Sequence, residues 1–186
     1  MQSHVKKASD VLNFWFEESG PKQWFKKDPD FDELIKKRFL SIYQLAITNA
    51  LYGWRQDAAG RLAEIIVLDQ FSRNMFRDQP EAFAYDCLAV ALTQAAIDTG
   101  ADEDLLNQPE KLAFMYMPLM HSESATIHEQ AVAMFSKPGL ENNLEYEYKH
   151  KAIIDRFGRY PHRNEVLGRK STAEELAFLK QPGSSF

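Results

Sequence analysis

Apolar residues recur along this chain three or four positions apart, and the two-residue alternation of half-buried strands does not occur. Pro, Gly, Ser, Asp and Asn interrupt the pattern where helices usually begin and end. The expected helices run from the Ser9–Asp10 cap to Gly20, from Pro29 to near Gly53, from about Ala58 to Arg73, from Pro80 to Gly100, from Pro109 to Pro118, from the Ser122 cap to just before Lys137, from Asn142 or Asn143 to Gly158, and over a short segment opened by a Ser171–Glu174 capping box. The sequence therefore predicts an all-α chain of about eight helices.

Mostly short loops join these helices, which favours antiparallel packing of sequential helices, as an α-hairpin stack or an irregular bundle. No internal repeat of fixed period is visible. The length of 186 residues fits one domain. We expect a single helical domain over residues 1–186, in which residues 181–186 form a flexible tail.

The composition excludes several classes of protein. Apolar residues make up 45% of the chain, enough for a core and outside the disordered class. The longest apolar run, residues 114–120, is short and broken by Pro118, so we expect no membrane span. Residues 1–7 lack the apolar segment of a secretory signal. The lone Cys87 has no disulfide or metal-motif partner and reads as a small buried residue, so a reducing cytoplasm is the expected location.

Cations gather in one segment of an otherwise acidic chain. The net charge is −5, yet residues 149–170 hold seven Lys or Arg against two acids. Within this segment Arg156, Arg159, Arg163 and Arg169 lie close to His162, around a Gly turn and an X-Pro turn. A folded chain holds such a cluster only if carboxylates, carbonyls or a bound anion compensate the positive charges. Internal pairing and an anionic ligand are both open at this point.

Ionisable residues also appear where the helical pattern calls for apolar ones. Asp69 and Arg73 lie four positions apart on the apolar stripe of their helix, either as a buried strut or as a pair that faces a ligand. His150 shares a face with apolar neighbours and reads as a core histidine or a site residue. Helix capping by Ser122 accounts for Glu123 in a first turn but leaves His121 unexplained.

Motifs for metals and cofactors are missing. No H-E-x-x-H or E-x-x-H pattern occurs, and the arginines disfavour a cation beside the histidines, so we expect no metal. The chain has no Walker loop, no G-x-G-x-x-G and no G-x-S-x-G, and we expect no cofactor. Overall acidity and the lack of a long basic face argue against nucleic-acid binding.

Five strings carry a resemblance to a known family. They are D-V-L-N-F-W-F at 10–16, W-F-K-K-D-P-D-F-D at 24–32, R-L-A-E-I-I-V-L-D-Q-F-S-R-N at 61–74, M-P-L-M-H-S-E at 117–123 and R-F-G-R-Y-P-H-R-N-E-V-L-G-R at 156–169. In this order they resemble the bacterial domain of unknown function 924 family over nearly the whole chain. The resemblance implies an all-helical, tetratricopeptide-like fold and no assigned activity. Its motif positions fall on Asp69, Gln70, Arg73, Asn74, His121, Glu123, His150, Arg156, Arg159, His162, Arg163, Asn164 and Arg169.

We therefore predict that distant segments meet in one buried polar pocket for a small carboxylate or phosphate ligand. The predicted ligand-binding residues are Asp69, Arg73, His121, Glu123, His150, Arg156, Arg159, His162, Arg163 and Arg169. Whether the protein is an enzyme is open; if it is, a histidine is the expected proton carrier, because histidine titrates near neutrality. The alternative is a tetratricopeptide-like scaffold for a protein or peptide partner, in which the polar cluster is structural.

Overall fold

The computed structural model describes residues 7–185, and this part of the chain is helical without a strand, which confirms the all-α prediction. The α-helices are α1 (Ala8–Asn13), α2 (Pro21–Trp24), α3 (Pro29–Ala46), α4 (Ala58–Ile66), α5 (Ser72–Met75), α6 (Asp86–Asp98), α7 (Pro109–Met120), α8 (Ala125–Phe135), α9 (Glu141–Phe157) and α10 (Ala173–Phe178). The expected absence of a secretory signal concerns residues that are mostly outside the described range, as is the last residue of the expected tail. No helix within residues 7–185 is both long and apolar enough to cross a membrane.

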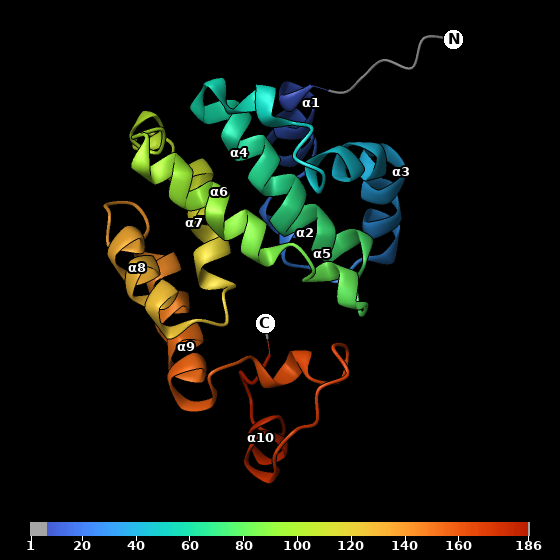
Figure 1. The fold of residues 1–186 in the computed structure, drawn as a ribbon, viewed down its shortest axis with the longest axis vertical. Helices are drawn as coiled ribbons and strands as arrows, with labels where there is room; N and C mark the ends of the chain where they lie inside the picture. Colours follow the sequence, from blue (N-terminus) through green and yellow to red (C-terminus); the bar gives the residue numbers. More distant parts are fainter. Residues whose placement is uncertain (1–6, 186) are drawn as a thin grey trace.

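Short non-α turns connect or extend these helices. A π-helical turn, Phe14–Glu18, continues α1, and a second one, Val67–Phe71, joins α4 to α5 so that the three form one continuous helix. Turns of 3-10 helix lie at Tyr52–Gln56, Pro80–Ala82, Glu103–Leu105 and Pro161–Arg163. The continuous helix through α4 and α5 crosses the middle of the molecule (Figure 1).

Several predicted helix ends are confirmed by their cap geometry. The carboxylate of Asp28 accepts hydrogen bonds from the backbone N–H groups of Asp30 and Phe31, and Pro29 opens α3. At the other end of the chain, α9 stops at Gly158, whose φ of 68° lies in the left-handed region that favours glycine. The capping box of α10 uses Thr172 and Glu175, one residue later than predicted.

Other predicted boundaries are wrong for identifiable reasons. Helix α3 ends at Ala46 rather than near Gly53, because the Thr48 hydroxyl donates to its last carbonyls and Asn49 turns left-handed at φ 59°. Helix α7 continues through Pro118 to Met120. Pro118 removes one hydrogen bond from the helix, and only two helical residues follow it.

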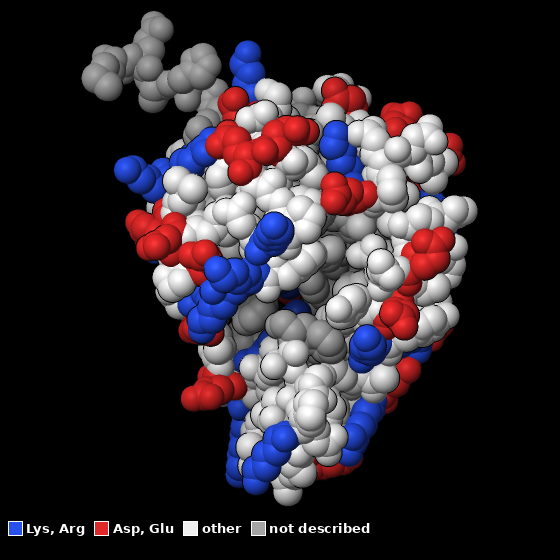
Figure 2. Space-filling view, turned by 180° about the vertical axis from the view of Figure 1, so that it is seen from behind, with Lys and Arg blue, Asp and Glu red and all other residues white. Residues whose placement is uncertain are grey.

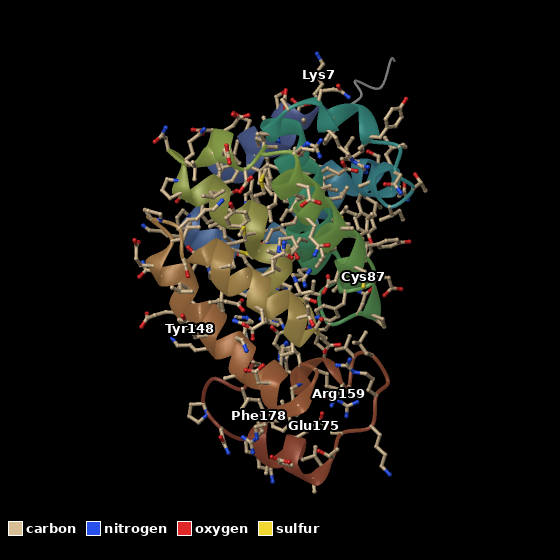
Figure 3. The ribbon with its side chains drawn as sticks, turned by 60° about the vertical axis from the view of Figure 1, so that its left-hand side comes forward. Lys7, Cys87, Tyr148, Arg159, Glu175 and Phe178 are labelled. Atoms are coloured by element: carbon tan, nitrogen blue, oxygen red, sulfur yellow. The ribbon has the colours of Figure 1, made fainter. Side chains whose placement is uncertain are left out.

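Two helices begin later than predicted. Helix α8 begins after Ser124, so Ser122 is not its cap and Glu123 is not in its first turn. Helix α6 begins at Asp86, since the 3-10 turn before it is tied to α5 by the Ser72 hydroxyl, which donates to the Ala82 carbonyl. This shift also changes the buried face of α6. Cys87 is exposed on the outer side of the helix, against the prediction of a buried residue (Figure 3).

The main core lies between helices α1 to α8. Aromatic rings from α3 and from the π-turn Phe14–Glu18 pack edge-on or tilted around Phe71 of the second π-turn, with Phe14, Trp15 and Phe39 as its close neighbours. Helix α7 packs against α4, α6 and α8, and α8 packs against α9. A small second core joins Ile153, Ile154 and Tyr160 to rings of the C-terminal segment. Helices α7 to α9 thus connect the main core to residues 158–178.

Gly60, in the first turn of α4, is required by the close approach of the preceding turn. An added Cβ would lie 1.8 Å from the carbonyl oxygen of Trp54 and 2.7 Å from its carbon, so backbone would have to move. We expect Gly60→Ala to lower the free energy of unfolding by about 2 kcal/mol, measured by urea denaturation. Gly53→Ala is the control, because nothing lies within 4 Å of its added Cβ. Equal stability of the two variants would contradict this account.

Candidate functional site

The π-helical turn places Asp69 inside the protein, where its side chain is 1% exposed. Arg73, one turn later, brings Nη1 within 3.2 Å of the Asp69 carboxylate and donates to the Asp69 carbonyl at 2.9 Å. Gln70 donates to the same carboxylate at 2.6 Å. The pair predicted from the helical pattern therefore forms, and π-turns of this kind are frequent at functional sites.

Asp86, at the start of α6, links two arginines that are far apart in sequence. Arg73 donates two hydrogen bonds of 2.9 Å to its carboxylate, one to each oxygen. Arg163 donates to the same carboxylate at 3.1 Å. Sequence reasoning missed Asp86, because it was expected inside a helix and its partner Arg163 is 77 positions away. No local pattern signals such a contact.

Arg163 is held flat in the wall between the C-terminal segment and the helices. Its guanidinium carbon lies 4.5 Å from the centre of the Phe83 ring and 4.6 Å from the centre of the Tyr160 ring. Nη2 donates to the carbonyl of His121 at 3.0 Å, while Nε finds no hydrogen-bond partner within residues 7–185. The side chain is therefore fixed by stacking and only partly satisfied by hydrogen bonds.

His121 follows α7 and points one ring nitrogen at Asp69, with 2.8 Å between Nδ1 and the carboxylate. Although burial would raise the pKa of Asp69, the charge of Arg73 and the hydrogen bonds from His121 and Gln70 hold that pKa well below its usual value. Asp69 is therefore ionised and Nδ1 carries the shared proton. Burial lowers the pKa of His121 despite Asp69, so the ring is neutral and Nε2 keeps its lone pair.

Nε2 of His121 makes no hydrogen bond to the described part of the chain, and the ring forms part of a cavity wall. A neutral imidazole in this position can accept a hydrogen bond or a proton from a bound molecule. The imidazolium that would result is stabilised by Asp69 behind it, as for a general base whose orientation is fixed by a carboxylate.

The cavity has a volume of about 780 Å³ and lies between the C-terminal segment and helices α5, α7 and α9. Figure 2 shows the molecule from behind, where a broad upper part narrows toward the lower part. The charged residues in its wall are Lys26, Arg73, Arg77 and Arg163, with Asp78 as the single acid among the described residues. The carboxylates that pair with the three arginines belong to Asp32, Asp69 and Asp86, which are not among the lining residues.

His150 and His162 also line this cavity, on either side of Tyr160. Nδ1 of His150 donates to the carbonyl of Tyr146 at 2.8 Å, and burial lowers the pKa of the ring to about 3. Burial, aided by the charge of Arg163, lowers the pKa of His162 to about 4. Both rings are neutral near pH 7. No group of three His, Cys, Asp or Glu side chains in residues 7–185 is arranged to hold a metal ion.

The remaining predicted site residues do not line the cavity, so the expectation of one pocket for all ten needs correction. Arg169 pairs with Glu123 at 2.5 Å, and Glu123 also accepts the backbone N–H of Tyr160 at 2.7 Å. Arg159 donates to both carboxylate oxygens of Glu175 at 2.6 and 2.8 Å. Figure 3 shows Arg159 and Glu175 together in the C-terminal part of the molecule.

Arg156 pairs with Glu174 at 2.8 Å on the surface. All four clustered arginines thus pair with internal carboxylates, because Arg163 pairs with Asp86. Arg156 joins α9 to α10, Arg159 joins two parts of residues 158–178, and Arg169 joins them to Glu123 before α8. This is the internal pairing that the charge pattern left open, and it leaves Arg163 as the arginine of the cluster that reaches the cavity.

A second buried pair escaped sequence reasoning. Nδ1 of His128, in α8, lies 2.6 Å from the carboxylate of Glu147, in α9, and both side chains are fully buried. Nε2 of His128 lies 2.9 Å from the carbonyl oxygen of Ser122, which can only accept, so Nε2 donates there. One proton is therefore shared between Nδ1 and Glu147. The helical spacing could have predicted that His128 is buried, since it shares the helical face of the buried Ala131 and Phe135.

Comparison with known proteins agrees with the motifs. The family described as "Bacterial protein of unknown function (DUF924)" matches residues 11–183. The chain belongs to this family. A solved structure, "Structure of Protein of Unknown Function ATU0120 from Agrobacterium tumefaciens", is similar with a TM-score of 0.87 and 35% identity, over 93% of this chain and 96% of that one. No curated protein matches. The family resemblance predicted from the sequence is confirmed, and it brings no activity with it.

Proposed function

We propose that this DUF924 protein binds a small organic anion, carrying a carboxylate or phosphate group, in the cavity beside Arg163 and His121. The proposal depends on the net positive charge of the cavity wall. Four cationic residues and one acidic residue line the cavity, and the carboxylates that pair with the three arginines are not among the lining residues. A bound anion would meet guanidinium and ammonium donors, with Asp78 as the single acidic residue among the described residues of the wall. Arg163 adds a planar donor group of fixed orientation, suited to carboxylate or phosphate oxygens.

His121 supports the same proposal by a different property, its capacity to accept a hydrogen bond. Its Nε2 supplies an acceptor among the donors, so the cavity favours an anion that also carries a hydroxyl, an amine or an acidic proton. Whether His121 only orients such a ligand or removes its proton decides between a binding protein and an enzyme. We propose a cytoplasmic location, as the sequence predicts.

Calorimetric titration with inorganic phosphate, acetate and succinate tests the proposal. We expect at least one of these anions to bind, and Arg163→Gln to weaken the binding about 10- to 100-fold, because it removes a charge-assisted contact. Arg156→Gln is the matched control: it removes the same charge, but from a surface pair outside the cavity. Circular dichroism checks that both variants are folded.

Two outcomes would contradict the proposal. If none of the anions binds, the tetratricopeptide-like scaffold with a purely structural polar cluster becomes the better reading, and the internal pairing of Arg156, Arg159 and Arg169 favours it. If both variants weaken binding equally, the anion responds to overall charge and not to this cavity.

A further inference from the structure

A second hollow of about 610 Å³ adjoins the polar cavity. The two share Trp24, Phe25, Met117 and Asn143 in their walls, so they meet at these residues. The second hollow is mainly apolar: beyond the shared residues it is lined by Pro21, Pro109, Ala113 and Phe114, with Gln108, Glu110, Lys111 and Gly139 completing its wall. The polar cavity thus opens at one end onto a surface of aromatic and aliphatic groups.

The aromatic group at this junction is rigid. Trp24 is 8% exposed, its indole N–H donates to the carbonyl of Trp15 at 2.8 Å, and its ring meets Phe114 edge-on with 4.8 Å between ring centres. Phe25 stacks on Phe114 with 6.3 Å between centres and 7° between planes. A ligand that reaches these rings would find a preformed apolar surface and would lose little energy in ordering it.

Phe25 is nevertheless 71% exposed. A large aromatic side chain gains little for folding when most of its surface stays in water. Exposed apolar groups that border a cavity are typical of ligand-binding surfaces. Phe25 lies where the two hollows meet, so an apolar chain that extends out of the polar cavity would cover its exposed ring.

The volume of the polar cavity also favours a ligand with an apolar part. A water molecule takes up about 30 Å³ in the liquid, so an acetate or phosphate ion would fill only a small part of the 780 Å³ beside Arg163. Cavities of about 300–1,000 Å³ are typical of sites for organic molecules of drug or metabolite size. The arginines can hold one end of such a molecule, and the remaining space extends toward the rings.

We infer that the ligand is an amphipathic monocarboxylate, whose carboxylate lies at Arg163 and whose hydrocarbon part extends over Trp24, Phe25 and Phe114. This inference rests on the proposed function, since it assigns the anion to the same cavity. It adds the class of the ligand: a carboxylic acid with an apolar chain or ring of several carbons.

Titration of the full chain with acetate, butyrate, hexanoate and octanoate tests the inference. Affinity is expected to rise about threefold to fourfold for each added methylene, since a buried methylene contributes about 0.8 kcal/mol. Phe25→Ala is expected to reduce this rise, measured as the ratio of the octanoate affinity to the acetate affinity. Tyr52→Ala is the control, because Tyr52 is 70% exposed, almost as much as Phe25, and lines neither hollow.

The outcomes separate the inference from the proposed function. If acetate or phosphate binds but octanoate binds no more tightly than acetate, the inference is wrong and the proposed function stands. An unchanged chain-length dependence in Phe25→Ala also overturns the inference, because the chain would then lie elsewhere. If octanol binds as tightly as octanoate, the carboxylate is not recognised and the proposed function fails.

Discussion

Acidification from about pH 7.5 to about pH 5 is expected to lower the free energy of unfolding by about 4 kcal/mol. The pKa of His150 is lowered to about 3 and that of His162 to about 4, both primarily by burial. In the unfolded chain both rings titrate near pH 6.5. Between these values the unfolded state binds protons that the folded state does not, so stability is complete above pH 6.5 and is lost as the pH falls. Each histidine accounts for about 2 kcal/mol of the loss.

Neighbouring groups act in the same direction. Arg163 and Arg73 oppose protonation of His162, and Glu123 only partly offsets them. The lowered pKa values of Asp69 and Glu123 remove further stability at still lower pH, where these carboxylates take up protons. The histidine contribution is therefore the one visible between pH 7.5 and pH 5.

Urea denaturation over this pH range measures the effect. His150→Asn keeps an N–H that can reach the carbonyl of Tyr146 and removes one titrating ring, so the loss between the two pH values should shrink by about half. A free energy of unfolding that stays constant down to pH 5, or a pH dependence that His150→Asn leaves unchanged, would show that these rings are not kept neutral by the fold.

His128→Leu is expected to lower the free energy of unfolding by about 3–5 kcal/mol. The substitution leaves the carboxylate of Glu147 fully buried without its partner, and one of its oxygens already lacks a hydrogen bond within the described residues. Burial raises the pKa of Glu147, and His128 is the main group that opposes this rise. Loss of the ring therefore leaves a carboxyl group that must stay protonated or be desolvated alone.

The double variant His128→Leu/Glu147→Leu distinguishes two causes of destabilisation, an unpaired buried carboxylate and altered packing. Two apolar side chains of similar volume remove both the charge and its need for a partner, so the double variant should be more stable than His128→Leu alone. Thermal unfolding should show the single variant melting about 6–20 °C below the unaltered chain, at about 2–4 °C for each kcal/mol. A double variant less stable than either single one would mean that packing, and not the shared proton, sets the cost.

Local sequence signals located many of the helices but only part of the site. Asp28, Pro29 and Gly158 fix helix ends through their own backbone chemistry, and the structure has them as predicted. Ser122 and Ser124 offer equivalent local signals for the start of α8. The choice between them is made by distant groups, because the Ser122 carbonyl accepts from His128 and Glu123 binds Tyr160 and Arg169.

The site residues divide in the same way. Asp69 and Arg73 were visible because both interrupt one apolar stripe. Asp86 was invisible, since its role depends on Arg163 from the far end of the chain. The number of charges in this segment does not distinguish Arg163 from Arg159, which lies four positions earlier. In the structure Arg159 pairs with Glu175. Only the folded C-terminal segment decides which of these guanidinium groups lies in the cavity wall, because both pair with a carboxylate.

The wall of the polar cavity also sets an order of events during synthesis. Trp24 and Phe25 leave the ribosome before Tyr160, Arg163 and Val166, which lie in the same wall. Domains form from the amino terminus while translation proceeds, so the helical core can assemble before any enclosed binding space exists. The proposed ligand can consequently stabilise the folded protein, but it cannot guide the growing chain.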